Sequence, residues 1–357
     1  MKIFIDIGHP AHVHYFKNFI WIMKEKGHEV TISARDKEVA LTLLDYYGFS
    51  YTNRGKGKTG IRGKLSYMLK ADRFLMKKAK HEHLDVFLSF ASPYAAQVAW
   101  FSGKPHIAFD DTDHNMFGHI MYVPFTKAIL TPKVYLKNQG SRQIRFDGFM
   151  ELCSLHPKRF KPNPEAAAEL AELGKDGKYI VLRFVSWQAS HDIGLTGLSL
   201  EEKYRLVREL SKYARVVISS EAALPDDLKG YAYSTHPAYM HDVLKGASLL
   251  VSESLTMSAE AVFLGTPSLC ISTAQAGTLD EEVRLGLIEI FRKSDGVIER
   301  ALDIVKDEDY KRKFEQKSID VIKDKIDVTA FMVWFVENYP ESFKVMKQDP
   351  DYQNTFK

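Results

Sequence analysis

Residues 245–268 read KGASLLVSESLTMSAEAVFLGTPS, and this stretch decides the fold class. Its apolar run, LLV, has the length and composition of a buried strand, and a polar turn and a helix that ends at Gly265 follow it. Ser254 and Thr256 are both suitable N-cap residues, and Pro267 leads into the next strand. A short buried strand that runs directly into a helix is typical of a parallel α/β sheet, so the rest of the chain is expected to alternate in the same way.

Strand–helix alternation indeed runs through both halves of the sequence. A proline-rich stretch, HPKRFKPNP at 156–164, interrupts it and is typical of a linker. We therefore expect a first domain over 1–155, a linker over 156–164, and a second domain over 165–338 that ends in continuous helix from 297. The tail, 339–357, is a candidate to return to the first domain, and its polar residues past Phe343 are expected to be loosely held. Apolar runs predict strands at 2–7, 29–33, 86–90, 107–109, 128–130, 179–184, 216–219, 249–252 and 268–271.

The composition excludes several classes of protein. The 357 residues carry 49 Lys and Arg against 46 Asp and Glu, a net charge of +3 that does not call for a nucleic-acid partner. Two cysteines, far apart in the sequence, do not support a disulfide framework, and no apolar stretch reaches the roughly 20 residues of a membrane helix. We expect a cytoplasmic protein. One local bias, ten Lys and Arg against one acid at 54–80, indicates either a solvated helix face or a peripheral contact with a membrane.

The stretch at 245–268 also predicts a binding site. A helix that begins at the carboxyl end of a parallel strand offers free N–H groups and a positive dipole end, which suit a diphosphate. The same feature can stabilise a departing nucleoside diphosphate without a metal. The alternative is purely structural, because strand–turn–helix units capped by Ser or Thr occur throughout α/β proteins.

The segment from Ala247 to Pro267 resembles the donor-site signature of GT-B glycosyltransferases, in particular the N-acetylglucosaminyltransferase of peptidoglycan synthesis. The resemblance implies that Thr256, Met257 and Ser258 cradle the diphosphate and that Glu260 binds the ribose hydroxyls. Leu255 stands where those enzymes often have glycine.

The same resemblance extends to the neighbouring loops. It implies that Asp280 and Glu281 read the donor sugar, although two acids at a helix N-terminus are also favoured by the helix dipole. It places the loop of His236 against the base, expected to be uracil. Arg183 and Ser186, directly after the first strand of the second domain, are candidate phosphate donors, with Trp187 and the His191–Asp192 pair close by.

The first half has its own candidate site in the loop GHPAHVH, which follows the first strand. A neutral histidine is the usual general base near pH 7, and an acceptor hydroxyl needs one. The position of the glycosyltransferase histidine falls on His12, but Pro10 changes the usual order, so His9 stays an alternative. His14 is expected to be a helix-end residue. A zinc site is disfavoured, because beyond Asp6 no ligand completes it.

A second polar cluster, FDDTDHN at 109–115, follows another expected strand. The carboxylates of Asp110, Asp111 and Asp113 could orient an acceptor, raise the pKa of a histidine, or act as the base. The structural alternative is an Asp/Asn-rich turn in which Asp113 caps a helix.

Taken over the whole chain, these motifs identify the sequence as a member of an uncharacterised prokaryotic GT-B-like family, related to glycosyltransferases and UDP-N-acetylglucosamine 2-epimerases. The resemblance implies two doubly wound Rossmann-like domains facing across a cleft. Its first implied function is an inverting, metal-independent glycosyltransferase of surface polysaccharide or glycoconjugate synthesis, with a UDP-sugar donor, no cofactor, and an anionic or lipid-linked acceptor. The alternatives are a 2-epimerase-like enzyme and a non-catalytic nucleotide-sugar binder. A dehydrogenase is disfavoured, since no Gly-x-Gly-x-x-Gly follows either first strand.

Overall fold

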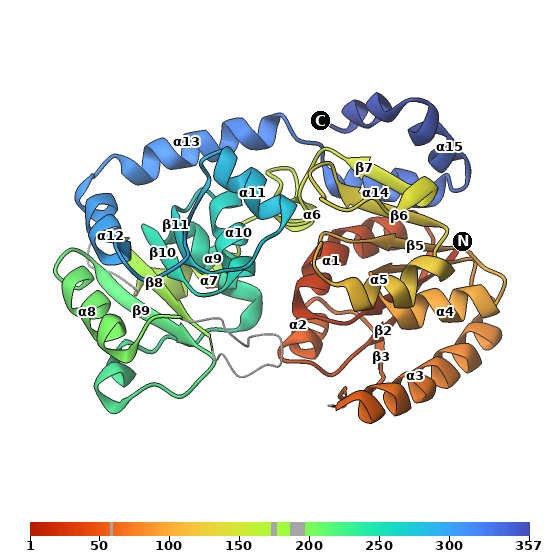
Figure 1. The fold of residues 1–357 in the computed structure, drawn as a ribbon, viewed down its shortest axis with the longest axis horizontal. Coiled ribbons are helices and arrows are strands. Elements are labelled where there is room, and N and C mark those ends of the chain that lie inside the picture. The colour runs from red at the N-terminus through yellow and green to blue at the C-terminus, as the bar shows by residue number, and fades with distance from the viewer. Residues whose placement is uncertain (58–59, 173–176, 186–196) are drawn as a thin grey trace. The chain divides into compact units, whose positions relative to one another are not determined.

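The computed structural model describes residues 1–57, 60–172, 177–185 and 197–357. The chain divides into two compact units. The first comprises Met1–Arg159, Ala276–Thr278 and Lys325–Lys357, and the second comprises Phe160–Gln275 and Leu279–Asp324. Each unit is built on one parallel sheet with helices packed against it (Figure 1).

The sheet of the first unit has seven strands in the order β3-β2-β1-β4-β5-β6-β7, and every neighbouring pair is parallel. The order reverses between β1 and β4, which is where doubly wound sheets bind their ligands. The strands are β1 (Lys2–Ile7), β2 (Glu29–Ala34), β3 (Tyr51–Asn53), β4 (Val86–Phe90), β5 (His106–Phe109), β6 (Ala128–Pro132) and β7 (Gln143–Phe146).

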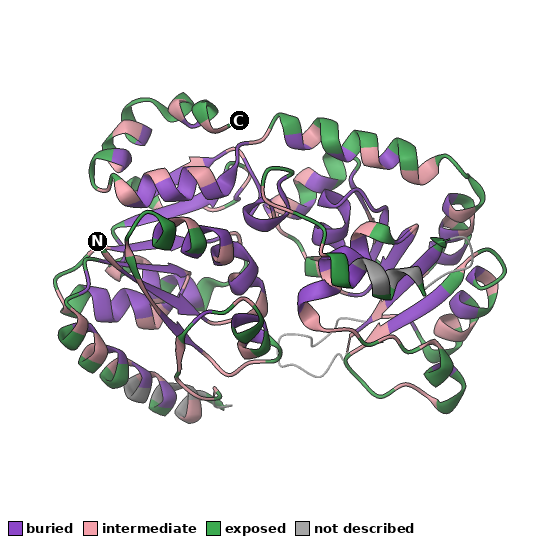
Figure 2. Cartoon of the chain, turned by 180° about the vertical axis from the view of Figure 1, so that it is seen from behind, coloured by how far each residue is buried: buried purple, intermediate pink, exposed green. Residues whose placement is uncertain are grey.

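Helices cover both faces of this sheet. In α1 the apolar positions Phe16, Phe19, Ile20 and Met23 are all fully buried, as their helical spacing predicts, and Gly27 follows the helix with a φ of 83°. The strands are buried almost throughout, whereas the outer faces of the helices are exposed (Figure 2). The helices are α1 (Pro10–Glu25), α2 (Ala40–Tyr46), α3 (Gly60–Glu82), α4 (Pro93–Phe101), α5 (Met116–Tyr122), the 3-10 turn η1 (Val123–Phe125) and α6 (Leu152–Leu155).

The C-terminal end of the chain belongs to the first unit and is well packed there. It forms α14 (Val328–Glu337), α15 (Glu341–Gln348) and the 3-10 segment η6 (Pro350–Phe356). The ring of Trp334 stacks on Tyr352 at 4.8 Å, and Gln353 accepts a hydrogen bond from the Asp147 N–H at 2.6 Å. The expectation of a loosely held tail is therefore wrong, because aromatic side chains of the tail pack against the apolar α14.

The second unit has a five-stranded sheet in the order β12-β11-β10-β8-β9, again parallel throughout, and its order reverses between β8 and β10. Its strands are β8 (Tyr179–Phe184), β9 (Arg215–Ser220), β10 (Leu249–Ser252), β11 (Ser268–Ile271) and β12 (Ile288–Phe291). Its helices are α7 (Pro164–Ala171), α8 (Leu200–Leu210), α9 (Met240–Gly246), α10 (Leu255–Phe263), α11 (Gly277–Arg284), α12 (Val297–Lys306) and α13 (Tyr310–Lys323), with 3-10 turns at Asp226–Tyr231 and Pro237–Tyr239.

Two details differ from the expectations. The stretch expected as continuous helix from 297 to 338 is broken into α12, α13 and α14 by turns after Lys306 and Lys323. The apolar runs also miss β3, β7 and β12, and all three are edge strands. Edge strands are partly exposed, so they carry polar residues and lack the continuous apolar run of a central strand. Within the described ranges, none of the helices combines the length and hydropathy that a membrane span needs.

Candidate functional site

At the switch point of the first unit, where the strand order reverses between β1 and β4, a buried ion pair connects the loops after β1, β3 and β4. Arg54 donates to both carboxylate oxygens of Asp6, from Nε at 3.0 Å and from Nη2 at 3.2 Å, and Ser92 donates its hydroxyl to Asp6 Oδ2 at 2.6 Å. Arg54 also donates to the Tyr67 hydroxyl at 2.6 Å. We call Asp6, Arg54 and Ser92 the clamp, because they fix the loops on both sides of the switch point.

His9 and His12 lie directly beside this clamp, in the loop that joins β1 to α1. His9 is the N-cap of α1, and its Nδ1 accepts the Ala11 N–H at 3.3 Å. The Nδ1 of His12 accepts the Gly8 N–H at 3.2 Å. An Nδ1 that accepts a hydrogen bond leaves the proton of a neutral imidazole on Nε2.

The charge state of His12 follows from its surroundings. Burial disfavours the imidazolium and lowers the pKa of His12 well below its ordinary value, and the positive charges of His9, Lys37 and Arg54 lower it further. His12 is therefore neutral at pH 7, as a group that exchanges a proton with an acceptor hydroxyl must be.

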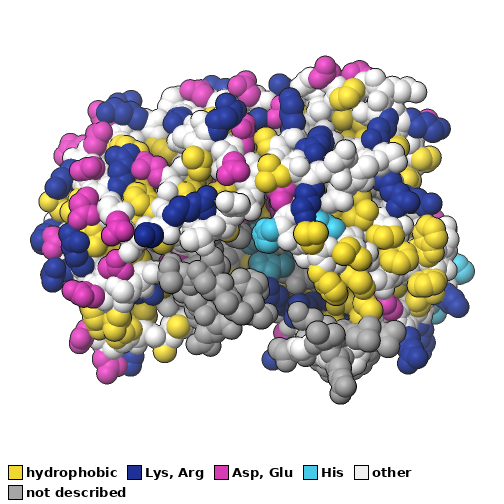
Figure 3. Space-filling model, viewed as in Figure 1, with side chains coloured by type: hydrophobic (Ala, Val, Ile, Leu, Met, Phe, Trp, Pro, Cys, Tyr) yellow, Lys and Arg dark blue, Asp and Glu magenta, His cyan; other side chains and the backbone are white. Residues whose placement is uncertain are grey.

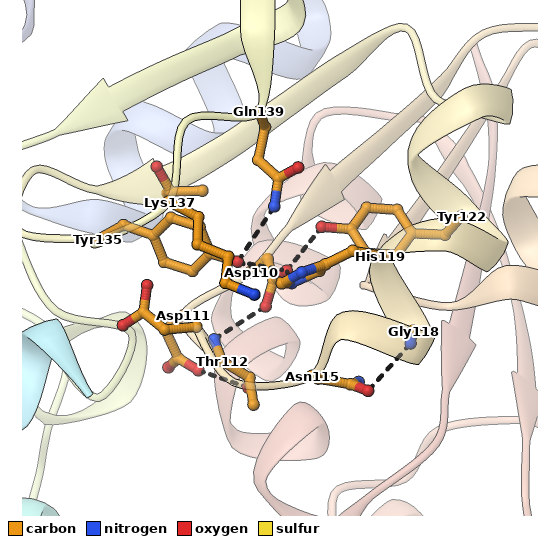
Figure 4. A network of polar contacts seen from close by, with 12 residues as sticks. Asp110, Asp111, Thr112, Asn115, Gly118, His119, Tyr122, Tyr135, Lys137 and Gln139 are labelled. Carbon is orange, nitrogen blue, oxygen red and sulfur yellow. Dashed lines mark hydrogen bonds and ion pairs between the residues drawn. The ribbon is translucent and has the colours of Figure 1, made fainter. Parts of the chain in front are cut away.

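The acidic cluster after β5 contains a fully buried carboxylate, Asp110, that is held on several sides (Figure 4). Its Oδ2 accepts from the Tyr122 hydroxyl at 2.6 Å and the Tyr135 hydroxyl at 3.1 Å, and lies 3.0 Å from His119 Nε2. Its Oδ1 accepts the Thr112 N–H at 2.9 Å. With four partners, Asp110 shapes the loop and is not available to a substrate.

The other two acids of the cluster differ from each other. The carboxyl group of Asp111 accepts a hydrogen bond from the Thr112 hydroxyl at 3.1 Å. Its pKa is raised well above the usual value, first by burial and then by the negative charges of Glu151 and Asp110. A carboxyl with so raised a pKa is a typical acid–base candidate. Asp113 is buried and accepts the Leu136 N–H at 2.7 Å, which gives it a structural contact.

At the switch point of the second unit, a buried glutamate connects the loops after β8 and β10. Glu253 follows β10 and accepts the N–H groups of Val185 at 2.9 Å and Leu198 at 2.8 Å. Four of the predicted positions, Ser186, Trp187, His191 and Asp192, lie outside the described residues.

The helix α10 begins directly after this glutamate. Ser254 is its N-cap and accepts the Met257 N–H at 3.4 Å. Of the predicted diphosphate contacts, Thr256 is exposed, Met257 is half-buried and Ser258 is buried. Only the outer part of this first turn is thus open to a ligand within the unit.

Glu260 lies one turn further along α10 and is 9% exposed. Its Oε1 is 3.3 Å from the Nε2 of His241 on α9. The pair fixes the carboxylate, which stays close to the N-terminal turn of α10.

The remaining predicted donor residues are distributed around the same edge of the sheet. Arg183 donates to the Ser219 hydroxyl at 3.0 Å and pairs with Glu221 at the end of β9. His236 caps the turn before α9, with its Nδ1 accepting the Ala238 N–H at 3.3 Å. Asp280 is exposed in the first turn of α11, and Glu281 pairs with Arg284 at 2.6 Å.

Sequence reasoning missed several residues that build these sites. Arg54 and Ser92 complete the clamp, and Glu253 connects the two loops of the second unit. Ser92 and Glu253 could have been found by position alone, since each follows the carboxyl end of a central strand. Among the described residues, no group of three or more His, Cys, Asp or Glu side chains is arranged to hold a metal ion.

Solved structures with this fold include proteins that handle sugars. The UDP-GlcNAc 2-epimerase from Neisseria meningitidis bound to UDP-GlcNAc is 12% identical, with a TM-score of 0.67, over 91% of this chain and 99% of that chain. The glycotransferase of kitacinnamycin is 13% identical, with a TM-score of 0.60, over 94% of this chain and 98% of that chain. The two parallel sheets and these likenesses confirm the predicted GT-B fold with two Rossmann-like domains.

The chain belongs to the family "Protein of unknown function (DUF354)", whose model matches residues 1–338. The resemblance to an uncharacterised GT-B-like family is thus confirmed. A curated relative, "Uncharacterized protein MJ0665" of Methanocaldococcus jannaschii, is 25% identical over 190 residues. The match spans 51% of this chain and 56% of that relative, about half the length of each.

Proposed function

We propose that the protein is an inverting, metal-independent glycosyltransferase that uses a UDP-sugar donor in surface polysaccharide or glycoconjugate synthesis. The observation that carries the proposal is the position of Glu260. Glu260 is a buried carboxylate on α10 that lies against His241 of α9, and α10 begins at the carboxyl end of β10, beside the switch point of its sheet. A carboxylate in this position can accept hydrogen bonds from both ribose hydroxyls of a nucleotide whose diphosphate lies at the start of the helix.

The donor side can work without a metal ion. The free N–H groups and the dipole of α10 stabilise the negative charge that develops on the leaving diphosphate. Thr256 is exposed in the first turn and is available to a phosphate. Met257 and Ser258 remain proposed contacts, although the N–H groups of both already bond to Ser254. Arg183, Ser186 and His236 remain proposed contacts to phosphate and base, and Asp280 and Glu281 to the sugar.

On the acceptor side, His12 is the proposed base and His9 its alternative. A neutral His12 suits this role, but its Nδ1 already accepts from Gly8. To take a proton, the ring must release that bond or exchange tautomers. Asp111 is the second candidate because of its raised pKa, and Asp113 is proposed to hold the loop.

The acceptor is proposed to be anionic or lipid-linked, and the protein cytoplasmic with a peripheral membrane contact. The basic stretch at 54–80 supports this proposal. In α3, Ala71, Leu75 and Ala79 face the core, while Arg73 and Lys77 are exposed. The cationic face of this helix is therefore open to an anionic partner.

Nucleotide binding to Glu260→Gln tests the donor site. Wild type, Glu260→Gln and the matched surface control Glu289→Gln are compared by thermal shift with UDP, other nucleoside diphosphates and UDP-sugars. A ligand at 100 times its dissociation constant should stabilise the protein by about 2.7 kcal/mol. We expect UDP to stabilise wild type and the control, and Glu260→Gln to lose that stabilisation while keeping its own melting temperature within a few degrees.

The outcomes separate the candidate functions. The absence of stabilisation by any nucleoside diphosphate would refute the donor site. If UDP binds, release of UDP from a UDP-sugar that rises with added acceptor supports the transferase. Formation of an epimeric UDP-sugar without acceptor would assign the protein to the epimerases, and binding without turnover would leave a nucleotide-sugar binder.

A further inference from the structure

The helix α5 buries its polar side chains and exposes its apolar ones, which is the reverse of the usual arrangement in an α/β protein. Its polar side chains, His119 and Tyr122, point inward to the buried carboxylate of Asp110. Its large apolar side chains point outward. Met116 is 64% exposed, Phe117 73% and Ile120 67%. A helix that covers a sheet normally buries its apolar stripe and exposes its polar one. The inversion therefore needs an explanation outside the folded chain.

The exposed apolar surface continues onto the neighbouring helix. Trp100 and Phe101, at the end of α4, are 48% and 70% exposed. Figure 3 shows hydrophobic side chains gathered over α4 and α5 on one continuous surface. We call Trp100, Phe101, Met116, Phe117 and Ile120 the α4–α5 face. Single exposed apolar residues are ordinary, whereas a contiguous patch of this kind marks an interaction surface.

The charge of the surrounding chain indicates what covers this face. The sequence contains no Asp or Glu at 86–109 or at 114–146, and these two stretches carry six Lys and Arg. Lys127 places its Nζ 5.4 Å from the centre of the Trp100 ring, and Lys104 is exposed in the loop after α4. Arg142 donates to the backbone carbonyls of η1, next to the face. Aromatic and aliphatic side chains with a cationic border match a surface that is apolar inside and anionic outside.

We propose that the α4–α5 face docks on the surface of an anionic lipid bilayer. Phe117 and its apolar neighbours enter the boundary between headgroups and acyl chains, and Lys104 and Lys127 contact the lipid phosphates. A second copy of the chain is a poorer partner. A symmetric contact on this face would bring the same cations of both copies together, and the stretches 86–109 and 114–146 contain no Asp or Glu to neutralise them.

The docking places the proposed acceptor side of the protein at the membrane. The inner face of α5 holds Asp110, and Asp111 is the next residue along the loop. A lipid-linked acceptor would thus meet Asp111, the second candidate for the base, in the loop that precedes the docked helix. This last consequence rests on the proposed function, whereas the docking itself does not.

Sedimentation with lipid vesicles tests the proposal. The full chain is mixed with vesicles of phosphatidylcholine alone and with an equimolar mixture of phosphatidylcholine and phosphatidylglycerol. We expect binding to the anionic vesicles that weakens as salt screens the lysines. Phe117→Ser should reduce the partition coefficient roughly ten-fold. Lys104→Gln and Lys127→Gln should each reduce it about five-fold.

The control is Leu200→Ser, which removes an apolar side chain that is 51% exposed on α8 in the second unit. It should bind vesicles like wild type. Unchanged vesicle binding by Phe117→Ser, equal binding to both vesicle types, or no binding by wild type would each overturn the proposal. A wild-type dimer that Phe117→Ser converts to a monomer, without lipid binding, would assign the face to a second copy instead. Because no nucleotide is present, failure here leaves the donor-site experiment unaffected.

Discussion

Replacing Arg54 by methionine should destabilise the first unit by about 3–5 kcal/mol, because it removes one partner of a buried ion pair. The side chain of Arg54 is 2% exposed and that of Asp6 is 0% exposed, so water cannot take the place of the lost guanidinium. The substitution leaves Asp6 charged, with the Ser92 hydroxyl as its remaining side-chain donor among the residues that the structure describes.

Electrostatics should dominate this loss. Methionine fills much of the space of the arginine stem, so the cavity contribution is small. Two charge-assisted hydrogen bonds to Asp6 are lost, at 3.0 and 3.2 Å. The double variant Asp6→Asn with Arg54→Met should recover part of the loss, because it no longer buries an uncompensated charge.

Urea unfolding followed by tryptophan fluorescence measures the effect. Trp21, Trp100 and Trp334 lie in the first unit, so the signal reports mainly on it. The matched control is Lys2→Met, which breaks an exposed pair with Glu29 on the same sheet and should cost less than about 1 kcal/mol. If Arg54→Met lost no more stability than Lys2→Met, the clamp would not hold the switch point and the reasoning would be refuted.

Two further predictions concern protonation. Burial, reinforced by Asp6 and opposed by Arg54, raises the pKa of Asp72 to about 7, so its ionisation destabilises the folded state increasingly from about pH 4 to about pH 7. After allowance for solvent screening, Asp72→Asn should raise the free energy of unfolding by about 1–2 kcal/mol at pH 8 and leave it unchanged at pH 4, as measured by urea titration. If His12 is the base, His12→Gln should lower kcat by roughly 10²–10⁴-fold. The acid limb of the wild-type kcat/KM profile should then lie below about pH 6.5, because the pKa of His12 is lowered, and a limb above that pH would contradict the assignment.

Most of the strands that could be predicted from the sequence are central strands of their sheets. Central strands such as β1, β4 and β10 are continuous apolar runs, which set them apart from the helices between them. The edge strands β3, β7 and β12 were missed because polar residues interrupt their apolar runs, whereas the edge strand β9 keeps such a run and was predicted. The helix breaks after Lys306 and Lys323 were missed because short turns between helices need no proline or glycine.

For the candidate sites, the sequence located the loops that carry His12 and Asp111, but it did not define the contacts that these side chains make. Strand ends correctly located the loops of His12 and Asp111 at the carboxyl edge of the first sheet. The partners of these residues come from far along the chain, as Glu151 does for Asp111, and local spacing carries no information about them. The tautomer of His12 depends on a single backbone N–H, which only the folded loop defines.

The orientation of α5 is the clearest case in which tertiary contacts override local pattern. From the residues alone, a helix containing Phe117 and Ile120 would be placed with these side chains in the core and His119 outside. The buried carboxylate of Asp110 reverses that choice, because leaving it without donors would cost more than exposing the three apolar side chains. The apolar side chains are therefore turned outward by the same hydrogen bonds that shape the acidic loop. A bilayer that covers them would offset the cost of that exposure, and this connects the interior chemistry of the first unit to its outer surface.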